Sequence, residues 1–357
     1  MSEKLIYGIQ QIGVGVKNAY EAFEWYATRL GADASIFEDN NTATYMAPYM
    51  GGQPRKKRAI LAMNLQGGGG YEIWQYLERE PSAPKHSLQL GDTGIQICTI
   101  KSRDIDGAYK RLKAAGENVL TEVVVGVDKK RCFYMTDPYG NWLRIKEWDS
   151  WYTNYNHDLG GVCGAVIGVS DIDAARKLYS NVLGYDEVCA DETGEFNELA
   201  ALPGGNHRFR RVVLRHSAHR VGGFSKLLGD TELELIQVLD RAPHKIFEDR
   251  YWGDLGFIHL CFDIRNMSAL IDECAAAGFP FSIKSSESFD MGEANGRWGY
   301  LEDGDGTLIE FVETRKVPLI KKIGLNIDLR NRDPKKPLPD WMIKAMRFKR
   351  VKRFKKD

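Results

Sequence analysis

The feature that constrains the fold most is an internal duplication. Residues 71–81 read YEIWQYLEREP and residues 233–243 read LELIQVLDRAP, so Glu, Gln, Leu, an acid, Arg and Pro recur in register. Residues 131–147 (RCFYMTDPYGNWLRIKE) and 297–313 (RWGYLEDGDGTLIEFVE) share Arg, Tyr, Asp, Gly and the closing Glu in the same way. Self-similarity of this kind indicates that one structural unit recurs. The chain therefore reads as a duplicated pair of units, A-B-A′-B′.

Each of the four units opens with an apolar strand followed by a helix. The strands are IQQIGVGV, GIQICTI, GAVIGVS and HLCFDI, and the helices are NAYEAFEWYATRLG, DIDGAYKRLKAAG, DIDAARKLYSNVLG and NMSALIDECAAAG. Each helix ends at a glycine, which best tolerates the left-handed turn there. Alternating strands follow each helix. We predict an α+β fold of four βαβββ modules in two domains, with open mixed sheets that form cups.

The duplication also sets the predicted domain boundaries. Residues 1–150 form the first domain (modules 1 and 2), 151–160 a linker, 161–314 the second domain (modules 3 and 4), and 315–357 a basic tail. From residue 315 onward, 16 Lys and Arg stand against 4 Asp and Glu, although the whole chain has no net charge. The body has no broad basic face, so we expect no nucleic-acid partner for it.

The tail allows two interpretations. Trp341, Ala345 and Phe348 form an apolar stripe on a basic helix, with Met342 and Met346 beside it. The stripe either packs on the body or touches an anionic surface such as a membrane.

The sequence also indicates where the protein is expected to reside and whether it is expected to contain disulfides. No stretch approaches the roughly 18 apolar residues of a membrane span. The start, MSEKLIYG, lacks the apolar core of a signal peptide, so we expect a cytoplasmic protein. The six cysteines are scattered without a CxxC pair, which argues against a disulfide framework and a zinc ribbon. The oligomeric state stays open, with a homodimer among the expectations.

The pattern as a whole resembles the vicinal oxygen chelate superfamily, which contains glyoxalase I, methylmalonyl-CoA epimerase, extradiol dioxygenases and fosfomycin or bleomycin resistance proteins. The resemblance covers about residues 8–314. Its most specific stretches are VSDIDAARKLYSNVLGYD (169–186), DPYGN (137–141) and GDGTLIEF (304–311). It implies the cup-shaped fold and a small-molecule substrate. It fixes no single reaction, because function lies in the site and not in the fold.

The resemblance also implies ligand positions on the cup floor, one in the first strand and one in the last strand of each unit. In chain order these positions hold Gln11 and Glu72, Gly94 and Arg144, Gly164 and Glu234, and His259 and Glu310. If consecutive units pair, the site combines Glu234, His259 and Glu310. If unit one pairs with unit four, as in double-length glyoxalase I, it combines Gln11, Glu72, His259 and Glu310. His259 and Glu310 are metal ligands in both schemes.

An imidazole with carboxylates suits one divalent ion of Zn, Mn, Ni, Co or Fe. Such an ion polarises a carbonyl, and Glu310 is the candidate base that moves a proton at the adjacent carbon. We expect a metal-dependent glyoxalase- or epimerase-like isomerase or lyase. Two alternatives stay open: a bleomycin-resistance-like protein that binds a small molecule without catalysis, and a ring-cleaving Fe(II) dioxygenase. The dioxygenase would need a further histidine, at Gly164.

Three more residues are candidates for substrate binding. Arg144 is able to bind a substrate carboxylate with two hydrogen bonds, or it is held in a salt bridge. Trp74 and Tyr76 lie on the same face of their strand as Glu72, because side chains alternate along a strand. There they either contact a ligand or pack in the core.

Overall fold

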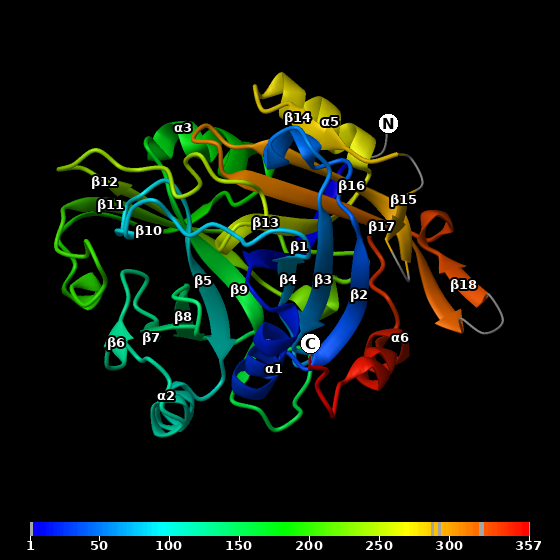
Figure 1. Ribbon diagram of the computed structural model, residues 1–357, viewed down its shortest axis with the longest axis horizontal. Coiled ribbons are helices and arrows are strands. Elements are labelled where there is room, and N and C mark those ends of the chain that lie inside the picture. Colours follow the sequence, from blue (N-terminus) through cyan, green and yellow to red (C-terminus); the bar gives the residue numbers. More distant parts are fainter. Residues whose placement is uncertain (1–2, 287–288, 292–293, 321–324, 357) are drawn as a thin grey trace.

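The computed structural model describes residues 3–286, 289–291, 294–320 and 325–356 and shows four βαβββ modules in chain order (Figure 1). Module 1 contains β1 (Leu5–Gly15), α1 (Ala19–Leu30), β2 (Ala34–Thr42), β3 (Lys56–Met63) and β4 (Gly70–Tyr76). Module 2 contains β5 (Gly94–Ser102), α2 (Ile105–Ala114), β6 (Val124–Val125), β7 (Arg131–Thr136) and β8 (Trp142–Glu147). The predicted order of elements is confirmed in both.

The second half repeats this order with additions. Module 3 contains β9 (Leu159–Gly168), α3 (Ile172–Arg176) continued by a π-helical turn at Lys177–Val182, β10 (Glu187–Gly194), β11 (Phe209–Arg215), α4 (Ser225–Leu228) and β12 (Glu232–Val238). Module 4 contains β13 (Gly256–Arg265), α5 (Met267–Ala276), β14 (Phe281–Lys284), β15 (Phe289–Met291), β16 (Ala294–Glu302) and β17 (Leu308–Ile320). The tail adds β18 (Leu325–Asp328), α6 (Asp340–Ala345) and a 3₁₀ turn at Met346–Lys349.

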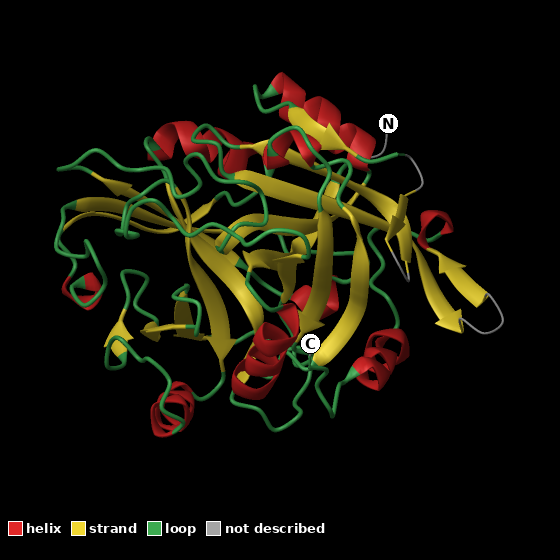
Figure 2. Ribbon diagram, in the orientation of Figure 1, coloured by secondary structure: helices red, strands yellow, loops and turns green. Residues whose placement is uncertain are grey.

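The modules assemble into two mixed sheets, shown in yellow in Figure 2. One sheet has the order β14-β16-β17-β13-β1-β4-β3-β2, with β15 on β16 and β18 on β17. The other has the order β10-β11-β12-β9-β5-β8-β7-β6. The first sheet joins module 1 to module 4 and is called the outer sheet. The second joins module 2 to module 3 and is called the inner sheet. The predicted α+β fold of curled mixed sheets is confirmed.

The two sheets do not coincide with the two sequence halves at 1–150 and 161–314. Neither half of the sequence forms a sheet by itself, because β1 pairs antiparallel with β13 and β5 pairs antiparallel with β9. Each first strand pairs with the first strand of another unit over most of its length, although register shifts interrupt both ladders. The duplication made this exchange feasible, because it gave the chain two copies of each edge.

Local signals explain why each module starts in the same way. The four long helices begin after Asn18, Asp104, Asp171 and Asn266, whose side chains accept hydrogen bonds from backbone N–H groups of the first turn. Such capping satisfies donors that a helix start leaves without partners. The predicted glycines Gly31, Gly116, Gly184 and Gly278 follow these helices with positive φ angles.

The repeated DPYGN (137–141) and DGDGT (303–307) motifs tie the modules together. Asp137 accepts hydrogen bonds from two backbone N–H groups of its own turn and from the Tyr26 hydroxyl at 2.7 Å. Asp303 does the same in the other half, with the Tyr179 hydroxyl at 2.8 Å. Each aspartate thus links a turn of one module to the helix of the preceding module. The packed core lies between the sheets and these helices.

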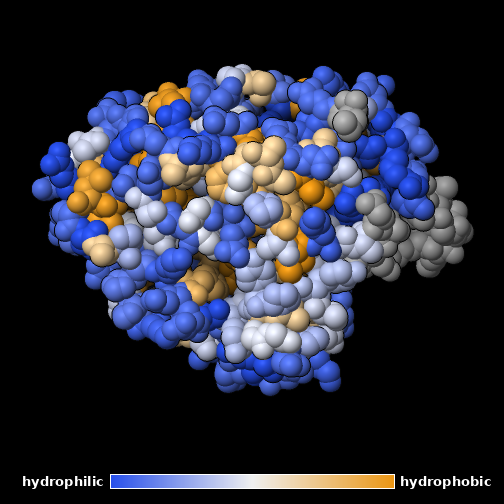
Figure 3. All heavy atoms as spheres, turned by 90° about the horizontal axis from the view of Figure 1, so that it is seen from above, coloured by the Kyte–Doolittle hydropathy of each residue, from blue (hydrophilic) through white to orange (hydrophobic). Residues whose placement is uncertain are grey.

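Two further expectations concern the cysteines and the surface. All six cysteines are free. Within the described residues, no helix combines the length and the apolar character that crossing a membrane requires. The face shown in Figure 3 is mainly hydrophilic, with a group of apolar residues near its middle.

Candidate metal centre

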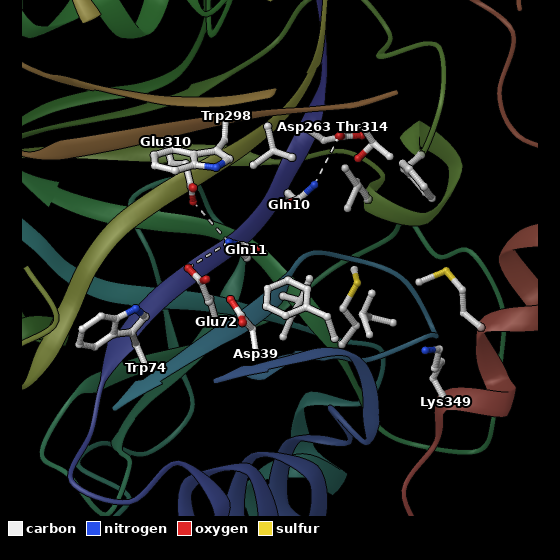
Figure 4. Close-up of a pocket in the computed structure, with 18 of the residues that line it drawn as sticks. Gln10, Gln11, Asp39, Glu72, Trp74, Asp263, Trp298, Glu310, Thr314 and Lys349 are labelled. Carbon is white, nitrogen blue, oxygen red and sulfur yellow. Dashed lines mark hydrogen bonds between the residues drawn. The ribbon is translucent and has the colours of Figure 1, made fainter. Parts of the chain in front are cut away.

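Four predicted ligand residues meet on the outer sheet. Gln11, Glu72, His259 and Glu310 come from β1, β4, β13 and β17, which are neighbours in that sheet. In the ladders Gly13 lies opposite both Glu72 and His259, and Cys261 lies opposite both Gln11 and Glu310. Figure 4 shows the side chains of Gln11, Glu72 and Glu310 pointing toward one another. The exchange between modules 1 and 4 therefore creates the cluster.

The distances in the cluster suit ligands that share one cation. His259 Nε2 lies 3.1 Å from Glu72 Oε2 and 3.1 Å from Glu310 Oε2. The amide nitrogen of Gln11 donates to the same two oxygens at 3.3 and 3.4 Å. Ligand atoms of Glu72, His259 and Glu310 all lie within 4.8 Å of one another. The imidazole and the two carboxylates would therefore have to move only a little to surround an ion.

Several polar atoms at this point are buried without a hydrogen bond. Neither ring nitrogen of His259 has a hydrogen-bond partner within the described parts of the chain, and neither does Gln11 Oε1. Orphaned buried polar atoms are rare, because each leaves a desolvation penalty uncompensated. Turning the Gln11 amide by 180° would put Oε1 where Nε2 now donates. One imidazole, two carboxylates and one amide oxygen then form a donor set that fits a divalent ion.

The electrostatics also favour a positive charge here. Burial lowers the pKa of His259, but Glu310 and Glu72 outweigh burial and raise that pKa to about 9. Burial raises the pKa of Glu72, but the interaction with the nearby His259 ring, whose Nε2 lies 3.1 Å away, brings that pKa below its ordinary value. Two carboxylates thus hold a cation at the imidazole, which is itself fully buried.

The sequence analysis missed the residues that orient His259. Trp252, from the loop before β13, stacks on the imidazole at 6.1 Å between ring centroids, and Tyr300 meets it edge-on at 5.4 Å. Gly13 lies against a third side of the imidazole, so close that an added Cβ atom at this position would lie 2.3 Å from His259 Cε1. The GVGV run at 13–16 was a visible signal for Gly13. Trp252 lies in an irregular loop and gave none.

The structure does not bring Glu234 to this cluster, which corrects its expected role as a ligand beside His259. Glu234 lies on β12 in the inner sheet, where it pairs with Arg144 and accepts a hydrogen bond from Arg211 Nε at 2.7 Å. Burial raises the pKa of Glu234, but Arg211 and Arg144 outweigh it and lower the pKa to about 2. The carboxylate is therefore already occupied by two guanidinium groups.

The same network corrects the expectation that Arg144 binds substrate. Its Nε donates to Thr99 Oγ1 at 3.1 Å, and its two terminal nitrogens pair with Glu234 and Glu232. Arg144 is buried, with 3% of its surface exposed. The guanidinium of Arg144 thus occupies the position in the inner sheet that corresponds to the ligand cluster in the outer sheet.

The two aromatic candidates differ in their roles. Trp74 lies in the wall of a cavity that Gln11, Glu72 and Glu310 also line, but it is fully buried and its ring packs against Tyr76 and Trp252. Tyr76 does not belong to this wall. Its hydroxyl donates to the backbone oxygen of Trp252 at 2.6 Å, so it holds the loop that places Trp252 on His259.

Comparison with known families agrees with this architecture. Two models of the Glyoxalase/Bleomycin resistance protein/Dioxygenase superfamily match the chain, one over residues 8–145 and one over residues 165–297. The matched segments cover most of the chain. The chain therefore belongs to this superfamily, which is the class that the paired βαβββ sheets indicate.

Solved structures resemble the chain at the level of the fold. A candidate dioxygenase from Bacillus subtilis is 14% identical, with a TM-score of 0.56 over 87% of this chain and 86% of that one. Glyoxalase I from Zea mays is 12% identical, with a TM-score of 0.52 over 87% of this chain and 92% of that one. A point mutant of the maize enzyme gives a TM-score of 0.55 at 13% identity over 87% of this chain and 92% of that one. At such identities the likeness establishes the fold alone.

Proposed function

We propose that the chain is a metal-dependent enzyme that moves a proton at a carbon next to a carbonyl, in the manner of glyoxalases and epimerases. The observation that carries the proposal is the position of His259 Nε2, which lies 3.1 Å from both Glu72 Oε2 and Glu310 Oε2 without a hydrogen bond to either. Gln11, Glu72, His259 and Glu310 are the ligands of one divalent ion.

The residues divide the work as follows. A divalent ion held there supplies a Lewis acid that polarises a substrate oxygen. Glu310 lines the cavity and takes the proton from the carbon beside that oxygen, then returns it to the same or to a neighbouring atom. Glu72, on the opposite side of Gln11, is the second carboxylate. Trp74 and Trp252 shield these carboxylates from water, which strengthens their charges.

Two alternatives are less well supported. A ring-cleaving dioxygenase site needs two histidines and a carboxylate, whereas His259 is the one histidine in this cluster. The position expected to supply the other, Gly164, lies on β9 in the inner sheet. A protein that binds a ligand without catalysis would not need two carboxylates turned toward one imidazole.

Metal analysis tests the site. The protein is stripped with EDTA, dialysed against Zn²⁺, Mn²⁺, Ni²⁺, Co²⁺ or Fe²⁺ and measured by inductively coupled plasma mass spectrometry. We expect about one ion per wild-type chain, a near-complete loss in His259→Gln, and no loss in the matched variant Glu234→Gln of the inner sheet. Equal loading of wild type and His259→Gln would refute the site.

A second measurement tests the chemistry. The metal-loaded protein is incubated with 2-hydroxyacetophenone in D₂O, and exchange at the carbon beside the carbonyl is followed by NMR. Wild type should accelerate exchange, and Glu310→Gln should lower that rate at least about a hundredfold, the lower end of the range for a lost general base. Undiminished exchange in Glu310→Gln would show that Glu310 is not the base.

A further inference from the structure

The cluster opens into one large cavity whose far wall is the C-terminal segment. The cavity has a volume of about 720 Å³, within the range of sites that enclose a drug-sized molecule. Gln11, Glu72 and Glu310 line one part of it. Figure 4 shows Lys349 of the C-terminal segment at a distance from these residues, across the cavity. The basic tail thus contributes to the cavity wall, and Leu338, Met342 and Ile343 of the tail are buried.

Most of the wall is apolar. From the outer sheet it includes aliphatic and aromatic side chains of β2, β3, β16 and β17, namely Ile36, Phe37, Leu61, Met63, Trp298 and Val312. Module 3 adds Phe224, Leu227 and Leu228, and the C-terminal segment adds Leu338, Met342, Ile343 and Met346. A ligand gains binding free energy by covering these side chains in proportion to its own apolar area.

The charges on the wall disfavour anions. Lys57 and Lys349 are the cationic residues of the wall, against Asp39, Glu72, Asp263 and Glu310. Lys57 Nζ already donates to Asp39 Oδ2 at 2.6 Å. Lys349 lies beyond the apolar part, on the C-terminal segment. A substrate with several carboxylates or phosphates would place unpaired charges beside apolar and acidic groups, which carries a large desolvation penalty.

A second polar group lies further along the cavity. Asp263 is on β13 and is 1% exposed. Its Oδ1 accepts a hydrogen bond from Gln10 Nε2 at 3.4 Å, and its Oδ2 has no partner within the described residues. Asp263 lies four residues after His259 on a regular stretch of strand, which separates their Cα atoms by roughly 13 Å along the same face. Figure 4 places Asp263 near Gln10, apart from Glu72 and Trp74.

The surroundings of Asp263 favour its neutral form. Burial raises the pKa of this carboxyl well above its ordinary value, and Glu313 raises it further. A neutral carboxyl both donates and accepts hydrogen bonds, so it suits a hydroxyl or a carbonyl oxygen and leaves no charge in the apolar wall.

We propose that the cavity takes an uncharged, largely apolar substrate with two oxygen functions, one at the Gln11–Glu72–His259–Glu310 cluster and one that hydrogen-bonds Asp263. The orientation of the first oxygen rests on the proposed function. The preference for an uncharged molecule and the contact with Asp263 rest on the cavity alone. Asp263 is therefore a residue that selects the substrate.

Three naphthalenes of one shape test this preference. 2-Acetylnaphthalene has the carbonyl alone, 6-acetyl-2-naphthol adds a hydroxyl at the far end, and 6-acetyl-2-naphthoic acid adds a carboxylate there. Binding to EDTA-treated and Zn²⁺-loaded protein is measured by isothermal titration calorimetry at pH 7.5. We expect the naphthol to bind about tenfold more tightly than 2-acetylnaphthalene, and the acid at least tenfold more weakly.

Two pairs of variants locate the contacts. Asp263→Leu should remove the advantage of the naphthol but keep the binding of 2-acetylnaphthalene, and the nearly isosteric Asp263→Asn should retain most of the advantage. Met346→Asp puts a charge into the apolar wall and should weaken both uncharged ligands at least tenfold. Its control is Trp341→Ala, on the same segment, whose side chain is 59% exposed and does not line the cavity. Circular dichroism checks that each variant is folded.

The outcomes separate this proposal from the metal site. Binding of the uncharged ligands to metal-free protein, with the predicted order, supports the cavity even if metal loading fails. The proposal is overturned if the acid binds as tightly as the naphthol, if Asp263→Leu and Asp263→Asn both keep the advantage of the naphthol, or if none of the three ligands binds. Metal stoichiometry does not enter these comparisons.

Discussion

Replacing Gly13 by alanine should displace His259 and so disable the metal centre without touching a ligand. Gly13 lies opposite His259 in the ladder between β1 and β13. A Cβ atom there would lie 2.3 Å from His259 Cε1, 2.5 Å from Nδ1 and 2.7 Å from Nε2. The ring cannot turn away freely, because Trp252 and Tyr300 pack against it.

The size of the effect follows from these distances. Ordinary contact begins at 3.4 Å, so the ring must withdraw by about 1.1 Å from the new methyl group. Ligand distances in metal sites tolerate only about ±0.2 Å. We expect metal affinity to fall about 100-fold, at the upper end of the effect of misorienting a ligand. The overpacked core should lose about 1–3 kcal/mol of unfolding free energy.

Competition between the protein and a chromophoric chelator for Zn²⁺ measures the affinity, and urea unfolding measures the stability. The control is Gly194→Ala on β10, where an added Cβ meets nothing within 4 Å. It should leave both quantities unchanged. If Gly13→Ala binds Zn²⁺ as tightly as wild type while His259→Gln does not, the contact with Gly13 does not set the ring position, and the reasoning fails.

Further predictions concern the inner sheet and the tail. Glu234→Gln leaves Arg144 and Arg211 buried with one carboxylate fewer, so urea unfolding should show a loss of about 3–5 kcal/mol, with metal loading unchanged. The pKa of Glu234 is lowered from 4.5 to about 2, so its contribution is complete above pH 4.5 and is lost as the pH falls toward 2. The stability difference between wild type and Glu234→Gln should therefore shrink by about 3 kcal/mol over that window; a constant difference would contradict the ion pairing. Deleting residues 338–357 exposes the cavity and removes the buried Leu338, Met342 and Ile343, so calorimetry should show a clearly lower Tm.

The sequence was informative wherever the signal is local. Helix caps, closing glycines and alternating strands depend on a few neighbouring residues, and all four modules appear where they were predicted. The resemblance to the superfamily also assigned each ligand position within a single unit of the chain. His259 and Glu310 were expected together because they belong to one module and to adjacent parallel strands.

What the sequence left open is non-local. The four first strands are similar in character, so no local property decides that β1 chooses β13 and not β5. Because β13 pairs with β1, it lies in the outer sheet, whereas β12 lies in the inner sheet, and Glu234 is therefore not beside His259. Arg144 and Glu234 gave no sign in the sequence that they face each other, since they come from different modules. Trp252 reaches the imidazole from an irregular loop, and its position depends on Tyr76.

The tail shows the limit of a periodic pattern. The stripe of Trp341, Ala345 and Phe348 was expected to pack on the body or to meet an anionic surface. Met342, expected beside this stripe, packs on the body together with Ile343, while Trp341 and Phe348 are 59% and 80% exposed. Helix α6 has only six residues and then tightens into a 3₁₀ turn, which shifts the faces relative to a continuous helix.

The outer sheet combines strands from the first and the last module of the chain, so it cannot be completed until module 4 has been synthesised. The inner sheet uses one continuous stretch, from β5 to β12, and is able to close as soon as that stretch has emerged. Strand β1 is made first but must wait for β13, and the hydrogen bond between Gln11 and Glu310 spans 299 positions. Until then β1 presents an open edge on which another chain could pair. The His259 cluster therefore cannot be complete before β13 and β17 have been made, and bound metal would mark the chains in which β17 has taken its place.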